Sequence, residues 1–140
     1  MFTRIDHVGL AVHDLDEAIA FYARTFDVHV VHEEVNEEQG VREAMLAVGS
    51  GDTATRLQLL APLTPDSPIA RFLDRSGEGV QQVAYTVEDV AAVASTLRER
   101  GVRLLYDEAR RGTAGSLVNF VHPKDAMGVL IELVELVHPD

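Results

Sequence analysis

Four polar residues stand in otherwise apolar, strand-like segments, and their types are those that bind metal ions. His7 and Gln82 lie in the first such segment of each half of the sequence, and Gln58 and Glu132 lie in the last. A polar side chain directed into the face of a sheet needs a partner, because burying it without one costs about 1–3 kcal/mol. One shared metal ion would satisfy an imidazole, two amide oxygens and a carboxylate at once.

Taken singly, each of these residues has a simpler interpretation. A histidine on a strand is more often a hydrogen-bonded structural residue than a ligand, and a glutamine such as Gln58 in Leu-Gln-Leu-Leu is usually exposed. The set is more specific because an internal repeat relates its members: His7 aligns with Gln82, and Gln58 with Glu132. Pseudo-twofold symmetry of this kind would bring both pairs to the same cleft.

The repeat predicts two βαβββ modules. Residues 6–15 (DHVGLAVHDL) align with residues 81–90 (QQVAYTVEDV), and in both an alternating strand ends at an aspartate and a helical pattern follows. Asp14 and Asp89 are the expected N-caps, and Gly101 should follow the second helix. Further strands are predicted at 28–34, 41–48 and 54–61 in the first half, and at 102–106, 116–122 and 129–137 in the second.

The expected fold class is α+β, with two tandem βαβββ modules forming an eight-stranded curved mixed sheet around a metal-binding cleft. Neither module could bury its sheet face alone, so residues 1–140 are expected to form a single domain. The first module covers about 1–62 and the second about 80–140. The intervening segment, about 63–79, has apolar residues at Ile69, Phe72 and Leu73 that suit a linker helix.

Composition excludes several classes of function. Hydrophobic residues make up 46% of the 140 and charged residues 25%, which is typical of a soluble globular protein. The net charge of −11 argues against nucleic-acid binding, which needs a basic face. No apolar run has the length of a membrane span, and the first residues lack a signal-peptide pattern, so we expect a cytoplasmic protein with no membrane partner. The absence of cysteine excludes disulfides, thiolate metal sites and a cysteine nucleophile.

Several sequence blocks resemble the methylmalonyl-CoA epimerases of the vicinal oxygen chelate (glyoxalase) superfamily. The blocks are 5–12 (IDHVGLAV), 39–41 (QGV), 67–70 (SPIA), 77–79 (GEG), 120–124 (FVHPK) and 128–133 (GVLIEL). They occur in order along almost the whole chain without large gaps. The first block alone would indicate only the superfamily, whereas the later blocks together are more specific to the epimerases.

The resemblance implies an isomerase, expected to be a homodimer, that inverts C2 of a methylmalonyl-CoA thioester with the help of a divalent metal ion. The residues that match the family's metal ligands are His7, Gln58, Gln82 and Glu132. Cobalt is the favoured ion, with Mn²⁺, Ni²⁺, Zn²⁺ and Mg²⁺ as alternatives. Many family members have two histidines where this chain has Gln81 and Gln82. An amide oxygen therefore replaces an imidazole, and the ligand set should be harder and bind metal less tightly.

The resemblance also carries the catalytic acid and base onto this chain. A catalytic glutamate matches Glu43, which strand alternation places on the inward face with Val41 and Met45. From the residues alone, an exposed glutamate paired with a basic neighbour is the simpler interpretation. Glu132 is the second catalytic candidate, but a metal-bound carboxylate is a weak base, so it is assigned as a ligand first. Lys124 is the tentative substrate-binding residue, available for phosphates or a carboxylate.

Two other functions stay open from the sequence. The first is another lyase or isomerase of the glyoxalase superfamily, although glyoxalase-type lyases usually have a glutamate where this chain has Gln58. The second is a metal-free small-molecule binding protein of the same fold. Such proteins usually lose the ligands, whereas all four positions here are polar and able to coordinate. The remaining histidines show no symmetric pairing and are interpreted as structural or surface residues: His13, His29, His32, His122 and His138.

Overall fold

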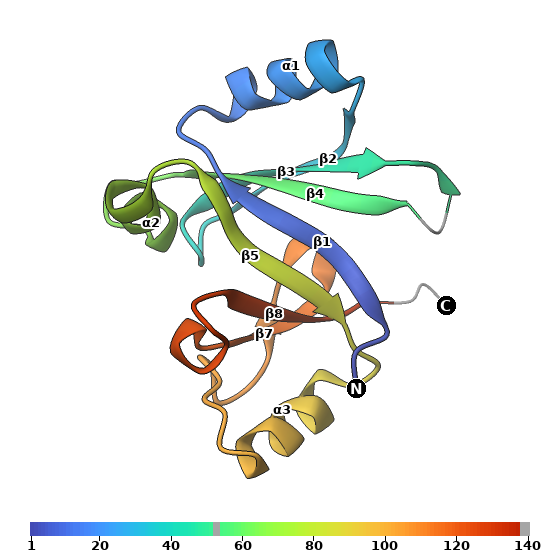
Figure 1. Cartoon of the computed structure of the whole chain (residues 1–140), viewed down its shortest axis with the longest axis vertical. Coiled ribbons are helices and arrows are strands. Elements are labelled where there is room, and N and C mark those ends of the chain that lie inside the picture. The colour runs from blue at the N-terminus through green and yellow to red at the C-terminus, as the bar shows by residue number, and fades with distance from the viewer. Residues whose placement is uncertain (52–53, 138–140) are drawn as a thin grey trace. The chain divides into compact units, whose positions relative to one another are not determined.

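A computed structural model of the chain describes residues 1–51 and 54–137 (Figure 1). The chain divides into two compact units. One is continuous, His7–Gln81, and the other combines Met1–Asp6 with the residues from Gln82 onward. Among the described residues, no helix is both long and apolar enough to cross a membrane.

The continuous unit holds the first βαβββ module and a linking helix. Its elements are β1 (Arg4–Ala11, which begins in the other unit), α1 (Leu15–Phe26), β2 (His29–Asn36), β3 (Val41–Val48), β4 (Thr55–Pro62) and α2 (Pro68–Ser76). The strands lie in the order β2-β3-β4-β1, with β4 and β1 parallel and the other neighbours antiparallel. The predicted helical pattern after Asp14 is therefore α1, and its cap is confirmed, because the Asp14 carboxylate accepts a hydrogen bond from the Glu17 amide at 3.0 Å.

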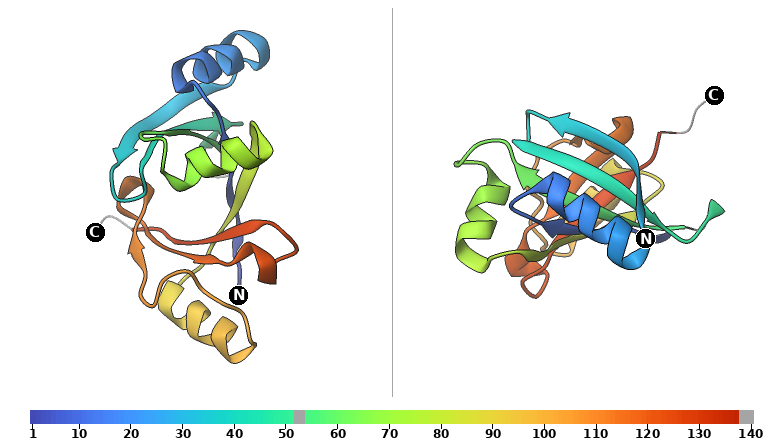
Figure 2. Two further views of the ribbon diagram at one scale, coloured as in Figure 1. Left: turned by 90° about the vertical axis from the view of Figure 1, so that its left-hand side faces the viewer. Right: turned by 90° about the horizontal axis from the view of Figure 1, so that it is seen from above.

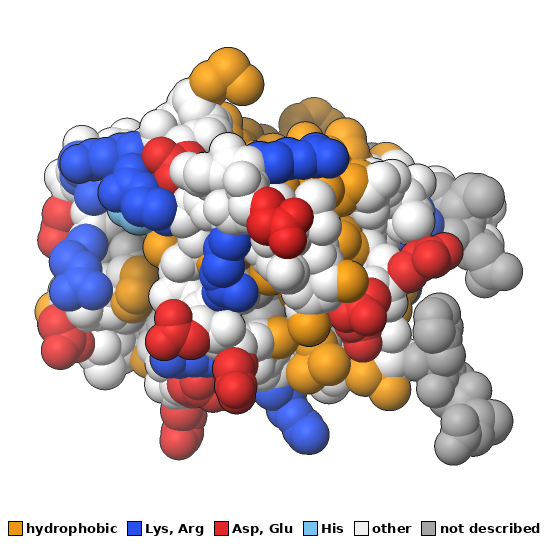
Figure 3. All heavy atoms as spheres, turned by 90° about the horizontal axis from the view of Figure 1, so that it is seen from below, with side chains coloured by type: hydrophobic (Ala, Val, Ile, Leu, Met, Phe, Trp, Pro, Cys, Tyr) orange, Lys and Arg blue, Asp and Glu red, His pale blue; other side chains and the backbone are white. Residues whose placement is uncertain are grey.

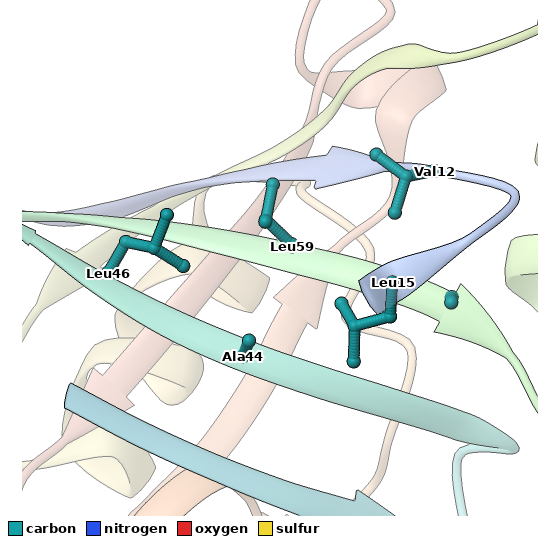
Figure 4. Close-up of a cluster of buried hydrophobic side chains, with 6 residues drawn as sticks. Val12, Leu15, Ala44, Leu46 and Leu59 are labelled. Carbon is teal, nitrogen blue, oxygen red and sulfur yellow. The ribbon is translucent and has the colours of Figure 1, made fainter. Parts of the chain in front are cut away.

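Helix α1 covers one face of this sheet (Figure 2). Leu15 packs with Ala44 and Leu46 of β3 and Leu59 of β4 in a cluster of buried apolar side chains that also includes Val12 (Figure 4). Because side chains alternate along a strand, the even-numbered residues of β3 face this helix. The odd-numbered residues, including Glu43, therefore face the other way.

Helix α2 packs against that opposite face. Its residues Ile69 and Leu73 form a buried cluster with Val41 and Leu60. The turn before β3 approaches the start of this helix so closely that a Cβ on Gly40 would lie 2.9 Å from the Cβ of Ser67, the helix N-cap. Gly40 also has a φ of +69°, which side-chain-bearing residues rarely adopt. The glycine thus lets the start of β3 sit directly beside α2.

The second unit contains β5 (Gly79–Thr86, whose first residues belong to the other unit), α3 (Val90–Glu99), β6 (Arg110–Arg111), β7 (Leu117–Val121) and β8 (Leu130–Glu135), in the strand order β5-β8-β7-β6. Short 3₁₀ helices lie at Thr113–Gly115 and Pro123–Asp125. Asp89 caps α3 by accepting from the Ala92 amide, as predicted, and Gly101 follows the helix with a φ of +82°. The first residues of the chain join this unit through Thr3, whose amide donates to the carbonyl of Thr86 at 2.9 Å.

The predicted α+β class and the two βαβββ modules are confirmed, with one wrong element. The strand predicted at 102–106 is reduced to an isolated bridge between Leu104 and Val121, and the paired strand is instead Arg110–Arg111. The physical cause is a side chain. Asn119 on β7 accepts from the Tyr106 amide and donates to the Tyr106 carbonyl, so it takes the place that a backbone partner would fill in a ladder.

Candidate functional site

The continuous unit positions His7 and Gln58 on one face of its sheet. Gly9 of β1 lies opposite Gln58 of the parallel strand β4, and His7 shares the face of Gly9 two residues earlier. Gly9 has no side chain beyond its backbone, so the Gln58 amide has room over β1. Both side chains are buried, with 2% of His7 and 3% of Gln58 exposed.

Glu43 lies beside Gln58 on the same face. Met45 of β3 is directly opposite Gln58, and Glu43 is two residues before Met45. The Nε2 of Gln58 donates a hydrogen bond to Oε2 of Glu43 at 3.0 Å, and Glu43 is 3% exposed. The interpretation of Glu43 as an exposed strand residue paired with a basic neighbour is therefore wrong. Its carboxylate is held inward by an amide.

The second unit has its own buried amide–carboxylate pair. Ala84 of β5 lies opposite Glu132 of β8, and Gln82 shares the face of Ala84. The Nε2 of Gln82 donates to Oε1 of Glu132 at 3.1 Å, and the two residues are 6% and 7% exposed. Each half of the chain therefore buries one glutamine and one glutamate that are hydrogen-bonded to each other.

The two pairs are not equivalent positions of the repeat. In the first module Glu43 lies opposite Leu60, and this pair is two residues along the strands from the pair of Met45 and Gln58. In the second module the pair at the same spacing from Phe120 and Glu132 is Val118 opposite Val134. A valine thus occupies the place of Glu43. The carboxylate of Glu43 therefore has no counterpart in the second module.

Sequence reasoning placed Met45 on the inward face but did not pair it with Gln58, and it did not single out Phe120. Met45 lies directly opposite Gln58, and Phe120 lies directly opposite Glu132. Both are buried, at 4% and 5% exposed. The repeat alignment relates Met45 to Phe120, just as it relates Gln58 to Glu132. This correspondence could be used only once the strand register was known.

Lys124 lies apart from these pairs, in the turn between β7 and β8. Its side chain is exposed, and its backbone amide donates to Nδ1 of His122 at 3.1 Å. The next residue holds the turn in place: the Asp125 carboxylate accepts from the backbone amide, Nε and Nη2 of Arg103 at 2.9–3.0 Å. The hydrogen bond from Arg103 lowers the pKa of Asp125 to about 2. On the face drawn in Figure 3, basic side chains are interspersed with acidic and hydrophobic ones.

The remaining histidines stand outside these pairs. His29 contacts Asp27 at 2.8 Å and His32 contacts Glu34 at 2.7 Å, all at exposed or half-exposed positions. His13 is exposed, and His122 takes part in the turn that carries Lys124. These contacts agree with a structural or surface role. His138 lies outside the described residues.

The donor atoms restrict which kind of metal site the chain could form. Within residues 1–51 and 54–137, no three histidine, aspartate or glutamate side chains gather closely enough to hold a metal ion. Amide oxygens can also bind a divalent ion, and Gln58 carries one in the continuous unit and Gln82 one in the second unit. Each amide donates through Nε2 to a carboxylate, and its Oε1 is the type of atom that can coordinate a cation. The donor set is chemically able to bind a divalent ion.

Comparison with known proteins gives a consistent family. Residues 6–120 match the Glyoxalase/Bleomycin resistance protein/Dioxygenase superfamily. The chain is 36% identical to an ethylmalonyl-CoA/methylmalonyl-CoA epimerase of Cereibacter sphaeroides, over 97% of this chain and 100% of the relative.

Two solved structures are closely similar in fold. Methylmalonyl-CoA epimerase from Mycobacterium tuberculosis is 55% identical with a TM-score of 0.92, covering 98% of this chain and 90% of that one. A variant of the Streptomyces coelicolor methylmalonyl-CoA epimerase, in complex with 2-nitronate-propionyl-CoA, is 50% identical with a TM-score of 0.94, covering 99% and 100%. The chain belongs to the methylmalonyl-CoA epimerases, a family of isomerases within the glyoxalase superfamily.

Proposed function

We propose that this protein interconverts (2R)- and (2S)-methylmalonyl-CoA by removing and returning the proton at C2, in a metal-dependent reaction. Membership of the epimerase family supports the substrate and the reaction. The observation that carries the mechanism is the buried hydrogen bond between Gln58 and Glu43, because it presents a carboxylate at a fixed place on an inward face of the sheet.

Glu43 acts as a general base in this mechanism. C2 lies between a thioester carbonyl and a carboxylate, so loss of its proton moves the electron pair of the C–H bond onto the thioester oxygen. Glu43 accepts the proton, while the hydrogen bond from Gln58 Nε2 to its Oε2 holds the carboxylate in orientation. Return of a proton to the other face of the planar enolate gives the opposite epimer.

Glu132 is proposed as the acid and base for that other face, in addition to a role as a ligand. Its carboxylate is buried, and it is oriented by Gln82 in the same way that Glu43 is oriented by Gln58. Two groups that serve opposite faces of C2 are the simplest arrangement for an inversion.

The residues that would hold a divalent ion are His7, Gln58, Gln82 and Glu132. Co²⁺ is proposed because the family resemblance implies it, and the donor set of one imidazole, two amide oxygens and one carboxylate can also hold Mn²⁺, Ni²⁺, Zn²⁺ or Mg²⁺. When bound, such an ion supplies Lewis-acid stabilisation of the negative charge that develops on the thioester oxygen. The proposal requires residues of the two units to share one ion, and it treats residues 1–140 as a single functional domain.

The remaining elements of the proposal concern the substrate's carrier and the assembly. Lys124 is proposed to bind a phosphate of the acyl-CoA, because it is exposed on a turn that Arg103 and Asp125 hold in place. A homodimer and a cytoplasmic location, both expected from the sequence, stay predictions.

Exchange of the C2 proton tests the proposed function directly. Methylmalonyl-CoA of one configuration is incubated in heavy water with protein purified without chelator, and deuterium incorporation at C2 and formation of the other epimer are followed by NMR. We expect both, together with co-purified divalent metal. Metal without exchange would favour another lyase or isomerase of the superfamily, and neither metal nor exchange would favour a metal-free binding protein.

A further inference from the structure

The second unit contains a rigid aromatic side chain beside the buried Glu132. Phe120 on β7 is directly opposite Glu132 on the antiparallel strand β8. Side chains of directly opposed residues project from the same face, with their Cβ atoms about 4.5–5.5 Å apart. The phenyl ring therefore lies beside the Glu132 side chain on this face of the sheet.

The backbone of Phe120 is fixed by its neighbour. Asn119 is 1% exposed, and its Oδ1 accepts from the amides of both Phe120, at 2.8 Å, and Tyr106, at 3.2 Å. Its Nδ2 donates to the Tyr106 carbonyl at 3.0 Å. One buried side chain thus ties β7 to the segment that carries Tyr106, while the β7–β8 pairing keeps Phe120 opposite Glu132.

The phenyl ring is also supported on its sides. The ring of Tyr106 meets it edge-on, with centroids 5.9 Å apart and an interplanar angle of 82°. The guanidinium of Arg110 in turn lies over the Tyr106 ring, 3.9 Å from its centroid. Buried Ala84, Val118 and Val134 complete the cluster around Phe120. Closely packed, short side chains leave the ring little freedom to move away from an incoming group.

The continuous unit, His7–Gln81, has a different residue at the position equivalent to Phe120. There Met45 lies opposite Gln58. Methionine is unbranched and flexible, and it adapts its shape to what packs against it, whereas a phenyl ring does not. Discrimination by size is therefore expected on the side of Phe120 rather than on the side of Met45.

We propose that the ring of Phe120 is the surface against which the alkyl group on C2 packs, so that it sets the largest alkylmalonyl-CoA that the enzyme epimerises. The inference rests on the proposed function, in which Glu132 serves the reacting carbon. The alkyl substituent is the one apolar group on that carbon, and Phe120 is the buried apolar residue next to Glu132 across the β7–β8 pair. Each additional methylene that the ring excludes should cost roughly 10–200-fold in kcat/KM.

Two variants test the proposal with methylmalonyl-, ethylmalonyl- and propylmalonyl-CoA as substrates. Phe120→Leu replaces the phenyl ring with a smaller side chain. Phe120→Met keeps most of the volume but replaces the rigid ring with a flexible chain, so this variant should disturb the fold less than Phe120→Leu does. The measurement is kcat/KM for exchange of the C2 proton in heavy water. In both variants the ratio for propylmalonyl-CoA over methylmalonyl-CoA should rise about tenfold or more relative to the parent.

A matched control lies one residue from Glu132. Ile131 is next to it on β8 but points to the opposite face, toward α3. Ile131→Val should leave the substrate ratio unchanged. If folded Phe120→Met exchanges methylmalonyl-CoA yet keeps the parental ratio, the alkyl group does not pack on Phe120 and the inference is wrong, while the proposed function stands. If the parent exchanges none of the three substrates, the proposed function fails and the inference fails with it.

Discussion

The Nε2 of Gln58 donates a hydrogen bond to the buried Oε2 of Glu43. The two residues occupy neighbouring antiparallel strands, and their pairing is diagonal, since Gln58 lies directly opposite Met45 and Glu43 is two residues away. A single amide thereby connects the residue proposed as the base with a residue proposed as a metal ligand. A substitution of either residue should therefore affect both the proposed base and the proposed metal ligand.

Glu43→Gln should bind methylmalonyl-CoA and metal about as well as the parent while the epimerisation rate falls by roughly 10²–10⁴-fold, because the amide keeps the shape but cannot accept a proton. If each face of C2 has its own base, exchange into heavy water should be lost more severely for one epimer. The control is Glu33→Gln, an exposed carboxylate on the adjacent strand β2. Near-parental exchange of both epimers by Glu43→Gln would show that another group carries the proton.

His7→Ala should remove most bound metal and most activity while the fold is retained, because His7 supplies the one imidazole of the proposed ligand set. Metal content by elemental analysis and secondary structure by circular dichroism give the two readouts. His13→Ala, at an exposed position two residues after β1, serves as the control. Full metal occupancy in His7→Ala would exclude His7 as a ligand.

Gln82→His should tighten metal binding and shift the preference toward softer ions such as Zn²⁺, because it replaces an amide oxygen by an imidazole nitrogen. Titration with Co²⁺, Mg²⁺ and Zn²⁺ measures the change. Gln81→His is a matched control, since the adjacent side chain points to the opposite face of β5. An unchanged affinity for every ion in Gln82→His would mean that Gln82 does not contact the metal.

Lys124→Gln should raise KM for methylmalonyl-CoA by roughly threefold to tenfold with little effect on kcat, because an exposed charge contributes modestly to binding a phosphate. The same variant should behave like the parent with methylmalonyl-pantetheine, which lacks the phosphates. Arg100→Gln, an exposed cation at the end of α3, is the control. An equal rise in KM for both thioesters would show that Lys124 does not act on a phosphate.

Asp125→Asn should lower the stability of the protein at neutral pH but not in acid. The hydrogen bond from Arg103 lowers the pKa of Asp125 from 3.8 to about 2. A carboxyl whose pKa is depressed in the folded state contributes stability above its unfolded pKa and loses it as the pH falls through the folded pKa. The difference in free energy of unfolding between parent and variant, measured by urea denaturation at several pH values, should shrink between about pH 4 and pH 2.

The elements that follow from local chemistry were predictable from the sequence. Asp14 and Asp89 were identified as helix caps because a carboxylate one residue before a helical pattern can accept a hydrogen bond from a backbone amide of the first turn. Both residues do so. Strand alternation put Glu43 on the face of Val41 and Met45, but only the family resemblance favoured an inward carboxylate over an exposed one.

The elements that depend on pairing between distant residues were not predictable. The strand at 102–106 failed because Asn119, more than ten residues later, occupies the hydrogen-bonding groups of Tyr106. The bond between Gln58 and Glu43 needed the register of β3 against β4, and the position of Phe120 needed that of β7 against β8. Side-chain patterns within one segment carry no information about register with another.

The grouping of Met1–Asp6 with the residues from Gln82 onward affects the order in which the chain can fold during its synthesis. The unit His7–Gln81 leaves the ribosome as one continuous stretch, before the residues from Gln82 onward are made. Thr3 is made before that stretch, but its partner Thr86 is made 83 residues later. The entropic cost of closing a loop grows only slowly with its length. The contact between Thr3 and Thr86 is therefore delayed mainly by the time needed to synthesise the residues between them. A nascent chain must therefore keep its first residues available until its second half has emerged, and a bulky N-terminal fusion would hinder the part of the protein that is made last.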